Sequence, residues 1–225
     1  MTALVKTLLA PGSRFGVLLA SLALMLFVPF VLPERLGIVA SPALFTVVLL
    51  SSLSAVADNR RHVTIGASLA IPGCVLIVAS WAGGSVVLDV VADVVALAFL
   101  GYVAILILVF VLRVRQVDLG IVLGSVCVYL LAALMWGKGY ALLEQLHPGA
   151  FAIPSTANGT TGEALQYFSF VTITTLGYGD IQPVIPLARM LSVLEAVVGQ
   201  LYLVILVSRL VGLYTALESP KRGGG

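Results

Sequence analysis

The sequence is dominated by apolar segments, each about as long as an α-helix must be to cross a membrane. Short joints that contain charged residues, Gly or Pro separate these segments. Apolar residues make up 60% of the 225 residues, charged residues make up 10%, and the mean hydropathy is +1.15. Water-soluble domains contain about 25% charged residues, so this composition excludes that class. The sequence predicts an all-helical membrane protein.

A helix needs about 20 apolar residues to span the hydrocarbon layer. We expect six such spans, at Phe15–Pro33, Leu36–Ala57, Val63–Trp81, Val86–Leu112, Val117–Gly137 and Val184–Leu217. We expect the first of them to be a true span, because no convincing small-x-small cleavage site of a secretion signal follows it. The stretch 138–183, before the sixth span, is polar at first and then apolar over a short run, so a simple loop does not describe it.

The distribution of basic residues predicts the orientation, because Lys and Arg in short loops resist transfer across the membrane. With six crossings, most of the basic residues fall on one side, and both termini are expected in the cytoplasm of a multi-pass cell membrane protein. That side holds Lys6, Arg14, Arg60, Arg61, Arg113, Arg115, Lys221 and Arg222, whereas Arg35, Lys138 and Arg189 lie opposite. We read these residues as anchors against membrane lipids and not as a nucleic-acid-binding patch.

A short apolar segment, EALQYFSFVTIT at 163–174, is long enough for three helical turns but too short to cross a bilayer. It reads as a re-entrant helix, and Thr161, Gly162 and Glu163 at its start are suitable for the first turn. Its C-terminal end would present partial negative charge to a cation that loses its water.

The heptapeptide TTLGYGD, at 174–180, begins at the last residue of this segment. For the carbonyls of successive residues to face one axis, the backbone must alternate with left-handed dihedral angles, which glycine adopts freely. Gly177 and Gly179 supply that alternation. The carbonyl oxygens of Thr175, Leu176, Gly177 and Tyr178, together with the Thr175 hydroxyl, can then replace the water around a monovalent cation.

TTLGYGD resembles the signature of the potassium channel family, whose members carry Thr-Val-Gly-Tyr-Gly or close variants, and Leu176 stands where Val is commoner. The resemblance covers 117–217 and is weak or absent before it. It implies a selectivity filter at 175–179 that binds K⁺, and passive conduction without an organic cofactor. Because one filter strand cannot surround an ion, it also implies a homotetramer. A chance Gly-rich turn is the alternative reading.

The resemblance also implies residues that support the filter, namely Thr174, Asp180 and Tyr167. In relatives the Asp after the filter hydrogen-bonds a group behind it, and Asp180 matches that position. The pore-helix carboxylate of some relatives falls at Val171 and is missing, whereas the aromatic donor falls at Tyr167. A brace from Tyr167 to Asp180 is therefore expected, with interfacial packing of Tyr167 as the alternative.

Two residues of the sixth span are candidates for gating. Gly199 falls where relatives often carry a hinge glycine, although close helix packing through a small residue explains it equally well. Glu195 is ionisable and lies inside an apolar span, where such residues are costly and often functional. We expect it to bond behind the filter or near the pore helix; the alternative is a polar contact with Gln200 or with a neighbouring subunit.

The fourth span lacks the charges of a voltage sensor, because no Lys or Arg occurs from Gly83 to Leu112. Asp89 and Asp93 lie one helical turn apart near its outer end. Their role stays open between solvation at the headgroups and a cation or proton site. His62 is read as a solvated loop residue or a sensor of cytosolic pH.

These features divide the chain into a four-helix non-pore domain at 1–116, a pore domain at 117–217 and a short cytoplasmic tail at 218–225. No nucleophile–base pair and no metal-ligand spacing occur in the sequence, so an enzyme is not expected. Gating would come from the membrane, the voltage field, ions, pH or a separate regulatory partner. Two rival functions remain: a subunit of a potassium transporter, and a membrane enzyme or sensor without conduction.

Overall fold

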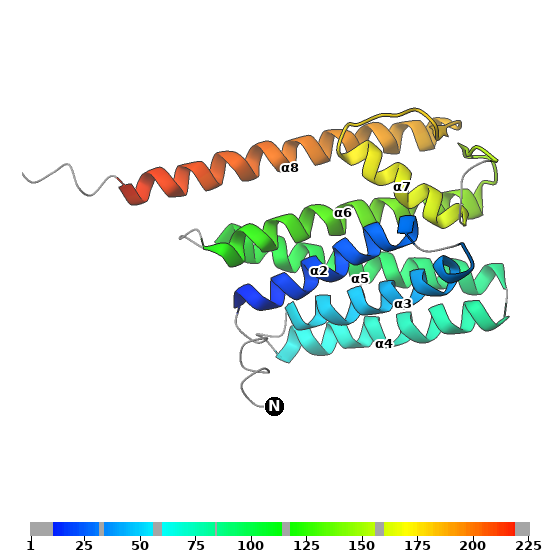
Figure 1. Cartoon of the computed structure of the whole chain (residues 1–225), viewed down its shortest axis with the longest axis horizontal. Coiled ribbons are helices and arrows are strands. Elements are labelled where there is room, and N and C mark those ends of the chain that lie inside the picture. Colours follow the sequence, from blue (N-terminus) through cyan, green and yellow to red (C-terminus); the bar gives the residue numbers. More distant parts are fainter. Residues whose placement is uncertain are drawn as a thin grey trace, which may run out of the picture.

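The computed structural model describes residues 11–31, 34–55, 60–83, 85–113, 118–155 and 160–218. It is all-helical apart from two short strands (Figure 1). The elements are α2 (Pro11–Val31), α3 (Glu34–Ala55), α4 (Arg60–Gly83), α5 (Val86–Arg113), α6 (Leu119–Leu146), β1 (Phe151–Ala152), α7 (Thr161–Ile173), β2 (Gln182–Pro183) and α8 (Pro186–Glu218). Several basic residues used for the predicted orientation (Lys6, Arg115, Lys221 and Arg222), and the tail from residue 219 onward, lie outside the described residues.

Helix α6 joins the two parts of the molecule. It packs against α5 and α2 on one side and against α7 and α8 on the other. The short helix α7 lies between α6 and α8 at one end of the bundle, and α8 runs along the outside of the molecule (Figure 1). Helix α6 therefore contacts both the preceding helices and the part of the chain that carries the predicted filter.

The apolar core between α2, α3, α5 and α6 consists of side chains that recur at helical spacing on each helix. Phe99, Leu100 and Val103 of α5 and Leu131 of α6 are almost completely buried there. A second cluster surrounds Tyr140 and Phe168 at the end of the molecule that carries α7. Together the clusters fix how α6 is rotated toward the filter region.

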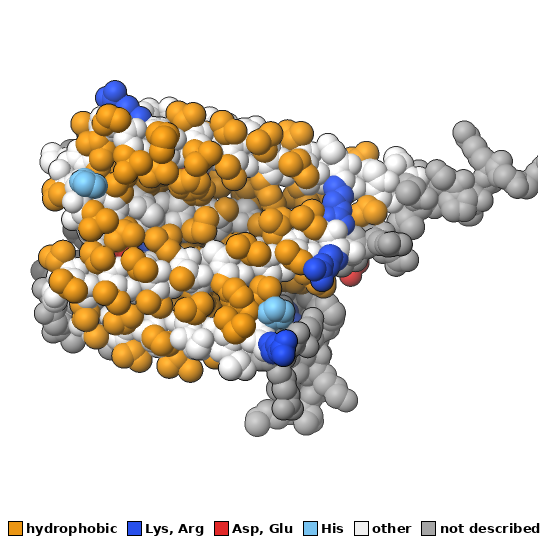
Figure 2. All heavy atoms as spheres, turned by 180° about the vertical axis from the view of Figure 1, so that it is seen from behind, with side chains coloured by type: hydrophobic (Ala, Val, Ile, Leu, Met, Phe, Trp, Pro, Cys, Tyr) orange, Lys and Arg blue, Asp and Glu red, His pale blue; other side chains and the backbone are white. Residues whose placement is uncertain are grey.

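Three of the described helices are long and apolar enough to cross a membrane, namely 86–113, 119–146 and 186–213. Shorter apolar helical stretches occur at 14–28, 43–52 and 61–76. Figure 2 shows one face on which apolar side chains form a broad band, with Lys, Arg and His side chains toward its two ends. The structure thus supports a membrane protein, whereas the number of six spans stays a prediction.

The helix that corresponds to the fifth expected span is longer than predicted. We expected it to end at Gly137, but α6 continues to Leu146 and ends just before Pro148. Lys138, expected at the membrane surface opposite the cytoplasm, lies inside this helix, and its Nζ is 2.8 Å from Asp93 Oδ1 of α5. Because Asp93 neutralises its charge, Lys138 can lie between packed helices. This basic residue therefore does not mark the end of α6.

The environment of Asp93 corrects one of its two suggested roles. Its side chain is 10% exposed and also accepts a hydrogen bond from Gln145 Nε2 at 2.9 Å. Asp93 therefore contributes to an interhelical network between α5 and α6, and solvation at the headgroups is wrong for it. Asp89 is half-buried in the first turn of α5.

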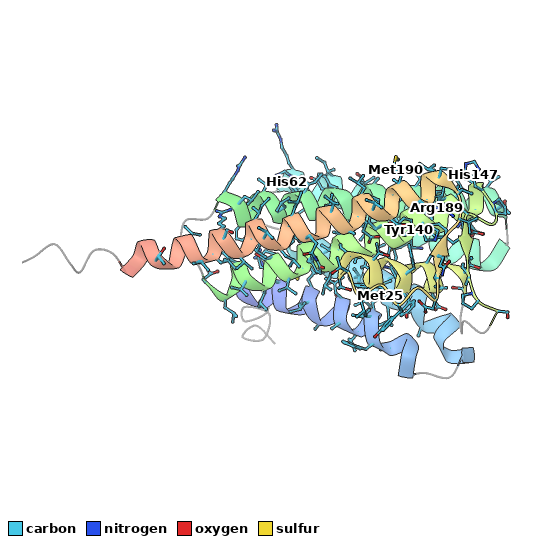
Figure 3. The ribbon with its side chains drawn as sticks, turned by 90° about the horizontal axis from the view of Figure 1, so that it is seen from above. Met25, His62, Tyr140, His147, Arg189 and Met190 are labelled. Atoms are coloured by element: carbon cyan, nitrogen blue, oxygen red, sulfur yellow. The ribbon has the colours of Figure 1, made fainter. Side chains whose placement is uncertain are left out.

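His62 also differs from the loop residue that we expected. It lies in the first turns of α4, and its Nδ1 is 2.9 Å from the Tyr102 hydroxyl of α5. Figure 3 shows His62 far along the bundle from His147. This contact indicates that His62 helps to hold α4 against α5, and its role as a sensor of pH stays a prediction.

Candidate functional site

A short helix, α7, precedes the heptapeptide where the sequence predicts one, and its re-entrant placement in a membrane stays a prediction. Helix α7 begins after Thr160, whose Oγ1 accepts a hydrogen bond from the Glu163 amide at 3.3 Å. The Glu163 carboxylate accepts one from the Thr160 amide at 2.8 Å, which completes a capping box. The cap is thus one residue earlier than expected, and Glu163 has the predicted position in the first turn.

The backbone of the heptapeptide alternates as predicted. Gly177 has a φ angle of 63° and Gly179 a φ angle of 77°, both in the left-handed region. Thr175 has a φ angle of 58°, which the sequence did not predict because left-handed dihedral angles are uncommon outside glycine. Left-handed geometry at every second residue is the conformation that lines up successive carbonyls along one side of a strand.

Hydrogen bonds from the end of α7 hold the first residues of this strand. The Thr175 amide donates to the Thr172 carbonyl at 2.9 Å, and the Leu176 amide donates to the Val171 carbonyl at 2.9 Å. The Thr175 hydroxyl donates to the Thr174 carbonyl at 2.7 Å. These bonds offset the cost of the left-handed threonine, which is about 1–3 kcal/mol.

The residues expected to support the filter lie next to it. Thr174 is the C-cap residue of α7, and its hydroxyl donates to the Phe170 carbonyl at 2.6 Å. Tyr167 lies within electrostatic range of Asp180, and the expected brace between them stays a prediction. Gln182 Nε2 donates to the Gly179 carbonyl at 3.0 Å, so the outer end of the strand has a contact that the sequence did not indicate.

A buried polar cluster lies behind the filter region, where α6, α7 and α8 meet. Glu195 of α8 is fully buried, and its Oε2 accepts a hydrogen bond from the Tyr140 hydroxyl at 2.6 Å. Its Oε1 lies 2.5 Å from the Ser169 hydroxyl of α7. Figure 3 shows Tyr140 between α7 and α8. Of the two contacts suggested for Glu195, the structure favours the one to the pore helix over the one to Gln200.

Gly199 lies where α8 touches the end of α7. A Cβ atom there would be 2.6 Å from Ile173 Cγ1 and 2.8 Å from the Ile173 carbonyl oxygen. The same carbonyl accepts a hydrogen bond from the Tyr129 hydroxyl of α6 at 2.8 Å. Gln200, the next residue of α8, has its Nε2 3.4 Å from Thr175 Oγ1. The geometry supports the close-packing explanation of Gly199, while a hinge role stays a prediction.

The loop before α7 is tied to the segment after the filter. Strand β1 pairs with β2 in antiparallel register, so that Phe151 faces Pro183. The Glu144 carboxylate accepts hydrogen bonds from the Gly149 and Phe151 amides at 2.7 and 2.9 Å. The rings of Tyr140, Phe151 and Phe168 pack edge to face with centroids 5.3–5.4 Å apart. Both ends of the filter segment are therefore attached to α6.

Among the described residues, no group of three or more His, Cys, Asp or Glu side chains could hold a metal ion. The polar atoms concentrated at this site are backbone carbonyls and hydroxyls instead. Such oxygen ligands are suited to an alkali cation that has lost its water.

Comparison with known proteins agrees with this geometry. Residues 121–216 match a family model described as ion channel. The chain is also 36% identical over 103 residues to the two pore potassium channel c of Oryza sativa subsp. japonica, across 41% of this chain and 22% of the rice protein. Residues 121–216 therefore resemble an ion channel domain, and the relative that the chain matches in part is a potassium channel.

The family model leaves the residues before 121 unmatched. The chain spans only about a fifth of the length of the rice protein that it matches, 22%. No solved structure matches the chain significantly. The ion channel domain is thus recognised from its sequence, whereas the surroundings of its filter come from the structure described above.

Sequence reasoning missed several residues of the ion channel domain. Tyr129, Tyr140 and Ser169 each donate a hydrogen bond across a helix interface. Gln166 adds a bond to the Ala133 carbonyl at 3.0 Å. The sequence signal that could have identified them is a polar residue within an apolar helix, because such a residue needs a hydrogen-bond partner inside the membrane.

Proposed function

We propose that the protein is a potassium-selective channel that conducts K⁺ passively through a tetrameric pore. The observation that carries this proposal is the alternation of left-handed dihedral angles at Thr175, Gly177 and Gly179 directly after a short capped helix. In this proposal the carbonyl oxygens of Thr175 to Tyr178 and the Thr175 hydroxyl bind dehydrated K⁺. The ion is the transported species, and no organic cofactor takes part.

The assembly into four copies is supported by the exposure of the pore region in the single chain. The side chains of Leu176 and Tyr178, which lie in the heptapeptide at 174–180, are 55% and 66% exposed. Large apolar side chains of α8 are exposed on the same part of the chain, namely Met190, Val193, Leu194, Val197, Val198 and Leu201. A ring of four copies around the filter axis would cover these side chains and complete the oxygen cages.

The proposed topology has six spans, with both termini in the cytoplasm and the filter near the outer surface of the cell membrane. In this arrangement residues 1–116 form a non-pore domain, residues 117–217 form the pore domain, and residues 218–225 form a tail. The helix bounds agree with this division, because α5 ends and α6 begins on either side of residue 116. A separate regulatory partner remains part of the proposal.

Ion flux from liposomes that contain the purified protein tests the function. We expect ⁸⁶Rb⁺ or K⁺ efflux that Ba²⁺ blocks, with much slower Na⁺ efflux. Flux that requires a counter-transported ion would favour a transporter subunit, and no flux in protein that is folded and tetrameric would favour a sensor. Equal rates for Na⁺ and K⁺ would contradict a selective filter.

The oligomeric state is tested separately by crosslinking in membranes and by mass measurement in detergent. A tetramer is expected. A monomer that retains its helices would exclude a pore built from one filter strand per chain.

A further inference from the structure

The short contacts around Glu195 favour a carboxyl group that holds a proton. The Ser169 hydroxyl lies 2.7 Å from the Ala133 carbonyl oxygen and 2.5 Å from Glu195 Oε1. A serine hydroxyl has one proton, so it can donate to only one of these two oxygens at a time. The Ala133 carbonyl oxygen can only accept.

Both short contacts are satisfied together when Glu195 is a neutral carboxylic acid. Its Oε1 then donates to the Ser169 oxygen, and Ser169 donates to the Ala133 carbonyl. The Tyr140 hydroxyl donates to the remaining oxygen, Oε2, at 2.6 Å. In the carboxylate form, Ser169 could donate to Oε1 or to the Ala133 carbonyl but not to both, so one of these two short oxygen–oxygen contacts would hold no proton, although Gln166 also donates to Ala133 at 3.0 Å.

The charges around this cluster also favour the neutral acid. Glu195 is fully buried, and its hydrogen-bonding partners, Tyr140 and Ser169, are both uncharged. Tyr129 of α6 is the other titratable group within electrostatic range of Glu195. Lys138 pairs with Asp93 of α5, and Glu144 accepts amides of the outer loop. Among the described residues, none of the hydrogen bonds or ion pairs of Glu195 involves a cation, and an unpaired charge in this position is costly.

Each proton of the cluster thus ties one helix to another. Glu195 lies on α8, Ser169 lies on α7 four residues before Ile173, and Tyr140 and Ala133 lie on α6. Because α7 carries the filter at its C-terminal end, this cluster fixes the filter support relative to the inner and outer helices. Loss of the Glu195 proton would leave a buried negative charge and would remove one of these hydrogen bonds, the one between Glu195 and Ser169.

We propose that Glu195 is a proton-binding site behind the filter, and that occupation of this site by a proton keeps the filter support in its conducting arrangement. Glu195 is a positioning residue, because it acts through Ser169 and α7 and touches no filter residue. The proposal deepens the proposed channel function and rests on it. The direction follows from the chemistry: the links form at low pH and are lost as the pH rises through the titration of Glu195.

The test compares K⁺ or ⁸⁶Rb⁺ flux of the full chain and of Glu195→Gln in liposomes at a series of pH values. Glutamine keeps the shape of the neutral acid, and its amide can donate to Ser169 while its oxygen accepts from Tyr140. For the unmodified chain, flux should fall about tenfold per pH unit beyond the midpoint and recover on acidification. Flux through Glu195→Gln should not change over the same range.

Tyr202→Phe is the matched control for a lost helix contact. The Tyr202 hydroxyl joins α8 to the Ser125 carbonyl of α6 at 2.7 Å, away from Glu195. This variant should keep the pH dependence of the unmodified chain, whatever its absolute flux. A flat profile for the unmodified chain, or a parallel decline in Glu195→Gln, would overturn the proposal.

Infrared spectroscopy reads the proton without conduction. At neutral pH the unmodified chain should show the C=O absorbance of a protonated carboxyl group, which Glu195→Gln lacks. A carboxylate band in its place contradicts the proton site. Absence of flux at every pH together with the protonated band would instead reject only the channel function.

Discussion

The ion channel domain and the helices before it are held together by different means. Helices α2, α3 and α5 meet mainly through buried apolar side chains such as Leu18, Val48 and Phe99, with the Ser21–Ser51 contact as a polar link between α2 and α3. Around α7, by contrast, hydroxyl, amide and carboxyl groups cross the helix interfaces, with Tyr140, Ser169 and Glu195 at the centre. Apolar packing tolerates small shifts, whereas a hydrogen bond fixes both distance and direction.

In the proposed channel, this difference follows from the task of each region. A filter has to hold backbone oxygens at fixed positions around an ion, and its strand includes a left-handed threonine that is unfavourable by itself. The preceding helices have only to pack against α6. We therefore expect the positions of the backbone oxygens in the ion channel domain to depend on backbone conformation and on polar contacts.

The largest effect is expected from Gly177→Ala. A Cβ at this residue meets nothing within 4 Å in the single chain, but the φ angle of 63° is strained for alanine by about 1–2 kcal/mol. We expect loss of K⁺ flux in liposomes with the helical content unchanged. Gly139→Ala is the control, because that glycine lies in α6 with equal space and without a positive φ angle. Normal flux through Gly177→Ala would remove the backbone argument.

Gly199→Ala should have the next largest effect. The added Cβ would overlap Ile173 at the end of α7, and overpacking of this kind costs about 1–3 kcal/mol. We expect a lower unfolding temperature in detergent and a changed open probability. Gly212→Ala is the matched control on the same helix, since nothing lies within 4 Å of its added Cβ. If the two variants behave alike, helix flexibility and not contact with Ile173 determines the effect.

The ion pair between α5 and α6 connects the two regions and allows the comparison to be sharpened. Asp93→Asn removes the charge that faces Lys138, whose side chain is 30% exposed and can reorient toward water. That exposure reduces the cost of a broken buried pair to about 1–2 kcal/mol. We expect lower thermal stability with K⁺ selectivity unchanged. Altered K⁺ over Na⁺ selectivity would show that the preceding helices position the filter directly.

The sequence predicts the parts of this structure that depend on local pattern. Apolar periodicity located the helices, and the Gly177 and Gly179 spacing located the left-handed residues of the filter strand. The predicted end of the fifth span was wrong because Lys138 was expected at the membrane surface. Its partner, Asp93, lies on another helix, and a pairing between distant residues leaves no periodic signal.

The contacts around the filter were predicted less completely for the same reason. The sequence indicated that Glu195 needs a partner, because an ionisable group inside an apolar helix is costly. It did not identify Tyr140 or Ser169, which lie 55 and 26 residues away along the chain. The left-handed Thr175 was also missed, because the hydrogen bonds that stabilise it come from the preceding helix end.

The smallest effect is expected from Tyr167→Phe, which removes the hydroxyl facing Asp180. A hydrogen bond to a charged group contributes about 1.5–3 kcal/mol when buried, but Asp180 is exposed in the single chain, so about 0.5–1 kcal/mol is expected here. We expect faster loss of conduction during prolonged opening, with initial K⁺ flux close to that of the unmodified chain. Asp180→Asn and the double variant complete a mutant cycle, in which the two effects should not add. Additive effects would mean that Tyr167 only packs at this surface, and that the outer end of the filter depends on Gln182 and on the β1–β2 pairing instead.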